Sequence, residues 1–101
     1  SYTIKGEVKN WTGRDTVTLF YAVDGAQKID TAIAKNGKFS FSGTLPEPRS
    51  GVLKHENRTS KSRPDALMLY LEEGKIEVKA VDSIRYATIN AGHTNKEYKE
   101  L

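Results

Sequence analysis

The side chains best suited to metal binding or proton transfer in this 101-residue chain are its two histidines, His55 and His93. They lie far apart in the sequence, and neither has a second histidine four residues away, as a helical metal site would require. The chain has no cysteine, which excludes disulfides, thiolate metal sites and cysteine nucleophiles within these residues. A metal site would need the histidines to converge from distant segments, so we expect them instead in solvent-exposed loops.

Adjacent carboxylates at Glu72 and Glu73 suggest general acid–base chemistry. Consecutive residues of a strand point to opposite faces, however, so these two carboxylates would not converge on one substrate. We expect them to end an apolar strand before Gly74. The chain also lacks a Gly-x-Ser-x-Gly elbow, a phosphate-binding glycine loop and a helical His-Glu motif. We therefore predict no catalytic residue, no cofactor and no metal ligand, and do not expect this chain alone to be an enzyme.

Positive charge is concentrated between residues 54 and 63, where four basic residues stand against one acidic residue, and this segment accounts for the whole net charge of +3. The basic residues are Lys54, Arg58, Lys61 and Arg63. Such a cluster attracts phosphate or an acidic surface. It contains no aromatic residue on which a base could stack, which argues against nucleic acid. A solvated loop is the simplest reading, and docking on a neighbouring domain or subunit is a third.

Trp11 is the single tryptophan and lies in a predicted turn beside Gly13. An exposed tryptophan in a loop can contact a carbohydrate or a peptide, but it more often folds back over the edge of the core. If the domain has an interaction surface, we expect it to involve Trp11 together with the four basic residues of the 54–63 segment.

The elements that carry these residues read as short β-strands. Apolar and polar residues alternate through 2–8, and two-residue turns at Asp24-Gly25 and Asn36-Gly37 predict a three-stranded meander over residues 16–45. The chain contains about eight short strands in all, at the spacing of a sandwich or a barrel, and we predict an antiparallel β-sandwich over residues 1–93. Its buried residues should include Phe39, Phe41, Leu69 and Ile76. Residues 66–71 are apolar on both faces, which predicts a central strand covered on each side.

The end of the chain reads differently. Thr94 and Glu97 have the spacing of a capping box, which predicts that a helix or linker begins over residues 94–101 and leads to a downstream domain. No apolar run approaches the roughly 18 residues that span a bilayer. We therefore expect no membrane insertion by this segment.

Several motifs occur in a set order along the chain, namely YTIKGEV, VTLFY, IDTA, NGKFSFSGTLPEP, LMLYLEEGKIEV and TINAGHTNKEY. In this order the chain closely resembles the domain of unknown function DUF4369, an N-terminal β domain of exported Bacteroidetes proteins. The positions that carry the resemblance are Asp30, Gly37, Lys38, Phe39, Phe41, Gly43, Glu73, Gly74 and Gly92.

The resemblance implies a non-catalytic accessory domain that precedes a thioredoxin-like thiol-disulfide oxidoreductase domain. Its partners would be that downstream domain, a substrate protein or a second copy, and its location the periplasm or cell envelope, with the parent protein anchored by lipid. The alternative is a stand-alone glycan- or peptide-binding module of a bacterial lipoprotein.

Overall fold

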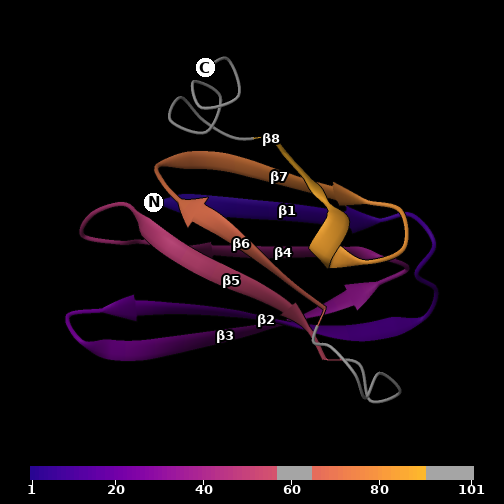
Figure 1. Ribbon diagram of the computed structural model, residues 1–101, viewed down its shortest axis with the longest axis horizontal. Helices are drawn as coiled ribbons and strands as arrows, with labels where there is room; N and C mark the ends of the chain where they lie inside the picture. The colour runs from indigo at the N-terminus through magenta and orange to yellow at the C-terminus, as the bar shows by residue number, and fades with distance from the viewer. Residues whose placement is uncertain (57–64, 91–101) are drawn as a thin grey trace.

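The computed structural model describes residues 1–56 and 65–90, and these form an all-β domain (Figure 1). The elements, in chain order, are β1 (Tyr2–Val8), β2 (Arg14–Val23), β3 (Ala26–Lys35), β4 (Lys38–Gly43), β5 (Arg49–His55), β6 (Asp65–Leu71), β7 (Gly74–Ala80), a 3-10 turn η1 (Ile84–Tyr86) and β8 (Thr88–Asn90). The predicted all-β class and the strand number are confirmed. The predicted helix start over residues 94–101 and His93 lie outside the described residues.

All eight strands belong to one sheet, in the order β6-β5-β2-β3-β4-β1-β7-β8. The sheet curls until β6 and β7 approach each other, so it is nearly closed into a barrel (Figure 1). The expected sandwich of two sheets is therefore not confirmed. The expectation of a purely antiparallel sheet is wrong, because β1 and β7 run parallel from Tyr2 opposite Gly74 to Val8 opposite Ala80.

Both predicted hairpin turns are present, and their backbone explains why the sequence specifies them. Asp24 and Gly25 have φ values of 51° and 81°, and Asn36 and Gly37 have φ values of 50° and 81°. Positive φ at both central residues is the requirement of a type I′ turn, which Asn-Gly and Asp-Gly meet at low cost. The predicted strand order β2-β3-β4 is confirmed, although the β3–β4 ladder comprises only the pair Lys35 and Lys38. Beyond that pair β4 leaves β3 and pairs with β1.

The core lies inside the curled sheet and contains the residues expected there. Phe39, Phe41, Leu69 and Ile76 are all buried, which confirms the predicted register of their strands. Full burial of an aliphatic or aromatic side chain of this size stabilises a fold by about 1.5–3 kcal/mol. The largest fully buried side chains are Ile4, Leu19, Leu53, Leu71, Ile76, Ile84, Val8, Val17 and Val78.

The prediction for β6 is wrong. The strand was expected in the centre of the sheet with both faces covered, but it lies at one end of the sheet order. Its outward side chains are exposed. Met68 is 72% exposed and Tyr70 37% exposed, whereas Leu69 and Leu71 on the alternate positions are buried. In β6, therefore, one apolar face packs into the core and the other apolar face is exposed at the surface.

Candidate interaction surface

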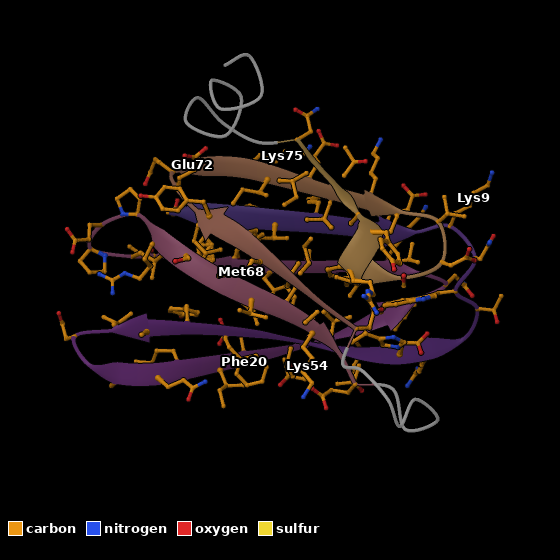
Figure 2. All side chains as sticks on the ribbon, in the orientation of Figure 1. Lys9, Phe20, Lys54, Met68, Glu72 and Lys75 are labelled. Atoms are coloured by element: carbon orange, nitrogen blue, oxygen red, sulfur yellow. The ribbon has the colours of Figure 1, made fainter. Side chains whose placement is uncertain are left out.

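A row of apolar side chains crosses the outer face of four neighbouring strands. Phe20 of β2 lies opposite Ile29 of β3 and opposite Val52 of β5, and Val52 lies opposite Met68 of β6. We call these four residues the apolar row. Ile29 is 57% exposed and Met68 72% exposed, while Phe20 and Val52 between them are half-buried. Figure 2 shows Phe20 and Met68 on the strands that face the viewer.

A shallow hollow of about 380 Å³ adjoins the apolar row near the β2–β3 turn. Phe20, Val52 and Met68 line it together with small residues, among them Ala22 and Gly51. None of its lining residues is charged. An uncharged hollow beside exposed apolar side chains is suited to an apolar group of a partner, because neither side would leave a charge desolvated.

The outer face of β4, β1 and β7 has the opposite character. Lys5 lies opposite Glu77, and Glu7 lies opposite both Lys38 and Lys79. The broad groove of about 650 Å³ over these strands is lined by six charged residues: Lys5, Glu7, Lys38, Lys75, Glu77 and Lys79. Alternating signs on neighbouring strands make favourable cross-strand pairs and keep a face hydrated. The domain therefore has one polar side and one apolar side.

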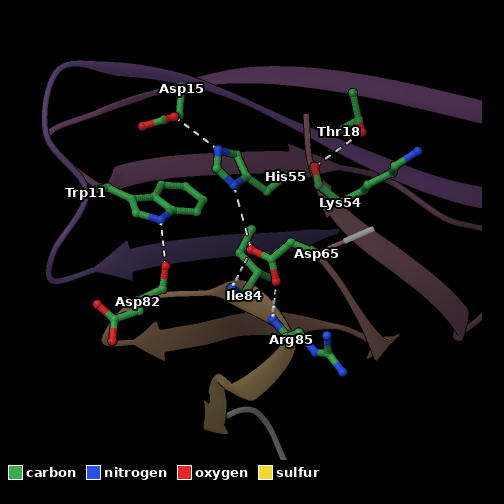
Figure 3. Close-up of polar contacts among 9 residues, drawn as sticks. All are labelled: Trp11, Asp15, Thr18, Lys54, His55, Asp65, Asp82, Ile84 and Arg85. Carbon is green, nitrogen blue, oxygen red and sulfur yellow. Dashed lines mark hydrogen bonds and ion pairs between the residues drawn. The ribbon is translucent and has the colours of Figure 1, made fainter. Parts of the chain in front are cut away.

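His55 lies at the end of β5 and is only 7% exposed, so the expectation of a solvent-exposed loop histidine is wrong. Its Nε2 lies 3.0 Å from Asp15 Oδ1, and its Nδ1 lies 3.7 Å from Asp65 Oδ2 (Figure 3). The Trp11 ring covers the imidazole, with 4.0 Å between the ring centroids. The burial follows from long-range pairing, since His55 lies opposite Val17 and Asp65 in the sheet.

The carboxylates around His55 are occupied by structural hydrogen bonds. Asp65 accepts the backbone N–H groups of Ile84 at 2.9 Å and Arg85 at 2.8 Å, and so holds η1 against β6 (Figure 3). The Trp11 indole N–H donates to the Asp82 carbonyl oxygen at 2.8 Å. Within residues 1–56 and 65–90, no group of three or more His, Cys, Asp or Glu side chains could hold a metal ion. This polar cluster thus connects β2, β5, β6 and η1.

Comparison with models of known protein families identifies one family that matches this chain. The model of DUF4369, a domain of unknown function, matches residues 2–98. The chain belongs to the DUF4369 family. No curated protein and no solved structure matched this DUF4369 domain. Among its described residues, no helix has the length and apolar character needed to cross a membrane.

Two of the residues predicted to form an interaction surface, Trp11 and Lys54, are described by the structure of the DUF4369 domain, and they lie in different places. Trp11 packs on His55 at the core edge, one of the two positions the sequence allowed for it. Lys54 lies on the outer face of β5, opposite Thr18 and Ala66. Arg58, Lys61 and Arg63 lie outside the described residues. Of the two residues that the structure describes, only Lys54 therefore adjoins the apolar row (Figure 2).

The apolar row itself was not predicted as a site. Its signal in the sequence is an apolar residue at both phases of β2, β5 and β6, as in VTLFY, GVL and LMLYL. For residues 66–71 this pattern predicts a central strand that is covered on both faces. Only the exposure of Met68 and Ile29 in the structure shows that no described element covers this outer face.

Proposed function

We propose that this DUF4369 domain is a non-catalytic accessory domain that binds another protein or domain through the outer face of β3, β2, β5 and β6. The observation that carries the proposal is the apolar row beside an uncharged hollow. Contiguous exposed apolar surface is costly to leave in water, and on soluble domains it marks surfaces that bind other proteins. The charged opposite face would keep the domain hydrated while the apolar face is occupied.

The surroundings of His55 support a structural rather than a catalytic assignment for that cluster. General acid–base chemistry needs a donor or acceptor that a substrate can reach. His55 is buried under Trp11, and both carboxylate oxygens of Asp65 accept hydrogen bonds from backbone N–H groups of η1. The cluster is therefore better suited to holding the barrel together than to turning over a substrate.

The family resemblance suggests the setting of this function. We propose that the domain stands before a thioredoxin-like domain in an exported, lipid-anchored protein of the Bacteroidetes cell envelope, and that it positions this domain or presents a substrate protein to it. Disulfide exchange requires a thiolate as the attacking group. This chain has no cysteine, so under this proposal the redox chemistry belongs entirely to the neighbouring domain.

The test uses the ¹⁵N-labelled DUF4369 domain and, as a separate unlabelled partner, the neighbouring domain of the parent protein. Titration of the DUF4369 domain with it should shift the amide signals of β2, β5 and β6 and leave those of β4 and β1 in place. Phe20→Lys should weaken binding about tenfold or more, because it introduces an unpaired charge into an apolar contact. Ser40→Lys, on the exposed outer face of β4, should bind like the unmodified domain. Equal binding by both variants would refute the assignment of the surface.

The second candidate function is a stand-alone glycan- or peptide-binding module, which would bind its ligand through Trp11. One face of the Trp11 ring packs on His55, and the indole N–H donates to Asp82. These contacts leave less of the side chain for a ligand. A glycan array with the unmodified domain and with Trp11→Phe tests this second candidate, since Trp11-dependent retention would favour it.

A further inference from the structure

The edge strand β6, at one end of the sheet order, lacks the features that protect other sheet edges. β6 pairs with β5 on one side, and no described strand pairs with it on the other. Within the part of the chain that the structure describes, no backbone hydrogen bond from outside the strand ladders reaches residues 66–71. The turn η1 lies beside the start of the strand, where Asp65 accepts its N–H groups. The remaining backbone groups form a template for another strand.

Natural sheets protect such edges with lysine, proline, inward-pointing charges or very short strands. β8, at the other end of the sheet, has only three residues. β3 is also largely unpaired on one side, because it meets β4 only at Lys35 and Lys38. This edge carries inward charges at Lys28 and Asp30, which lie opposite Tyr21 and Leu19. β6 contains none of these devices between Ala66 and Leu71.

We propose that β6 pairs antiparallel with β6 of a second copy of this chain, around a two-fold axis at Met68. In this register Met68 lies opposite its own counterpart, Leu67 opposite Leu69, and Ala66 opposite Tyr70. No two like charges face each other, because these five residues carry none. The register is centred on the midpoint of β6 and leaves Asp65 bound to η1. A two-fold interface uses the same patch on both copies and closes the assembly at two.

The register also joins the outer faces of the two copies. The apolar row ends at Met68, so the dimer would continue it without interruption into the row of the second copy. This inference does not depend on the proposed accessory function, since it rests on the backbone edge of β6, whereas that function rests on the outer side chains. The two can fail separately.

The absence of cysteine allows a direct test of the register. Analytical ultracentrifugation of the unmodified chain should show a monomer–dimer equilibrium with a dimer as the largest species. Met68→Cys should form a covalent dimer on mild oxidation or with a short bismaleimide cross-linker, because directly opposite Cβ atoms lie about 4.5–5.5 Å apart. Ala66→Cys and Tyr70→Cys should each cross-link poorly alone and efficiently when mixed. Ser40→Cys, on the exposed polar face, is the control that should stay monomeric.

A disrupting variant completes the experiment. Met68→Lys places two like charges opposite each other at the axis and should weaken dimerisation about tenfold or more. At concentrations low enough for both chains to be monomeric, its thermal melt and circular dichroism should match those of the unmodified chain, since Met68 is mostly exposed. A chain that sediments only as a monomer at millimolar concentration would overturn the proposal. A dimer that cross-links through Ser40→Cys but not through Met68→Cys would overturn it equally.

Discussion

The Asp65 carboxylate accepts a hydrogen bond from the backbone N–H of Ile84 at 2.9 Å, at the end of the sheet order where β6 has no described strand on its second side. Ile84 is fully buried, so this contact fixes the turn η1 at the same time as it fixes a core side chain. The barrel is thereby completed by a carboxylate and a short turn instead of by a ninth strand.

Replacement of Asp65 should lower the free energy of unfolding. Asp65→Ala leaves the N–H groups of Ile84 and Arg85 without their acceptor, which costs about 1–3 kcal/mol. Asp65→Asn retains one carbonyl oxygen and should lose less. Urea denaturation followed by circular dichroism measures both, with Ser40→Ala on the exposed face as the control. Losses no larger than that of Ser40→Ala would contradict a closing role for Asp65.

His55→Leu should alter both stability and the environment of Trp11. The substitution removes the contact with Asp15 and the imidazole that packs on the indole ring, and we expect a loss of about 1–3 kcal/mol. Because Trp11 is the single tryptophan, its emission reports on this site alone. The emission maximum and intensity should change in His55→Leu and stay constant in Met68→Lys. Unchanged fluorescence in the first variant would argue against the stacking.

Alkaline pH should destabilise the domain through Tyr2. Burial raises the pKa of the Tyr2 hydroxyl above its ordinary value, and the neighbouring Tyr21 and Asp30 add to the effect. In the unfolded chain the group ionises near pH 10, so above that pH the unfolded state binds fewer protons than the folded state. Stability should be fully retained below pH 10 and then fall by up to about 1.4 kcal/mol per pH unit. Tyr2→Phe should reduce this slope, whereas Tyr86→Phe, at a residue that is 77% exposed, should preserve it.

Gly25 and Gly37 have the same φ value of 81°, so alanine would cause the same backbone strain at both positions. A difference between the two substitutions would therefore measure steric overlap. A Cβ at Gly25 would meet nothing within 4 Å, so Gly25→Ala carries only the cost of a left-handed alanine, about 1–2 kcal/mol. A Cβ at Gly37 would lie 2.0 Å from the Val8 carbonyl oxygen. Gly37→Ala should therefore cost about 1–3 kcal/mol more than Gly25→Ala. Equal losses in chemical denaturation would show that β1 can move away from the turn.

Local signals predicted the turns and the strand phases well. Asn36-Gly37 encodes its own geometry, and the buried position of Phe39 follows from the alternation that continues out of the turn. Pairing between distant strands is not encoded locally in the same way. The burial of His55 depends on Asp15 and Asp65, which approach it only when β2 and β6 flank β5.

The apolar row illustrates a second limit. Alternation shows which residues share a face, but an apolar outer phase is compatible both with a covered central strand and with an exposed edge. The sequence of β6 does not distinguish these two positions. The sheet order places β6 at an edge, and Met68 is exposed because no described element packs over its outer face. The surface therefore became recognisable as a site only in three dimensions.

The parallel pairing of β1 with β7 has a consequence for how the domain forms. Its first contact joins Tyr2 to Gly74, so the N-terminal strand gains its second neighbour only when most of the chain is available. Contacts between such distant residues require a large loop to close first, which places folding in the slow range of about milliseconds to seconds. A polypeptide that ends before Gly74 would leave β1 unpaired on one side. We therefore expect the nascent domain to remain unfolded until β7 has left the ribosome.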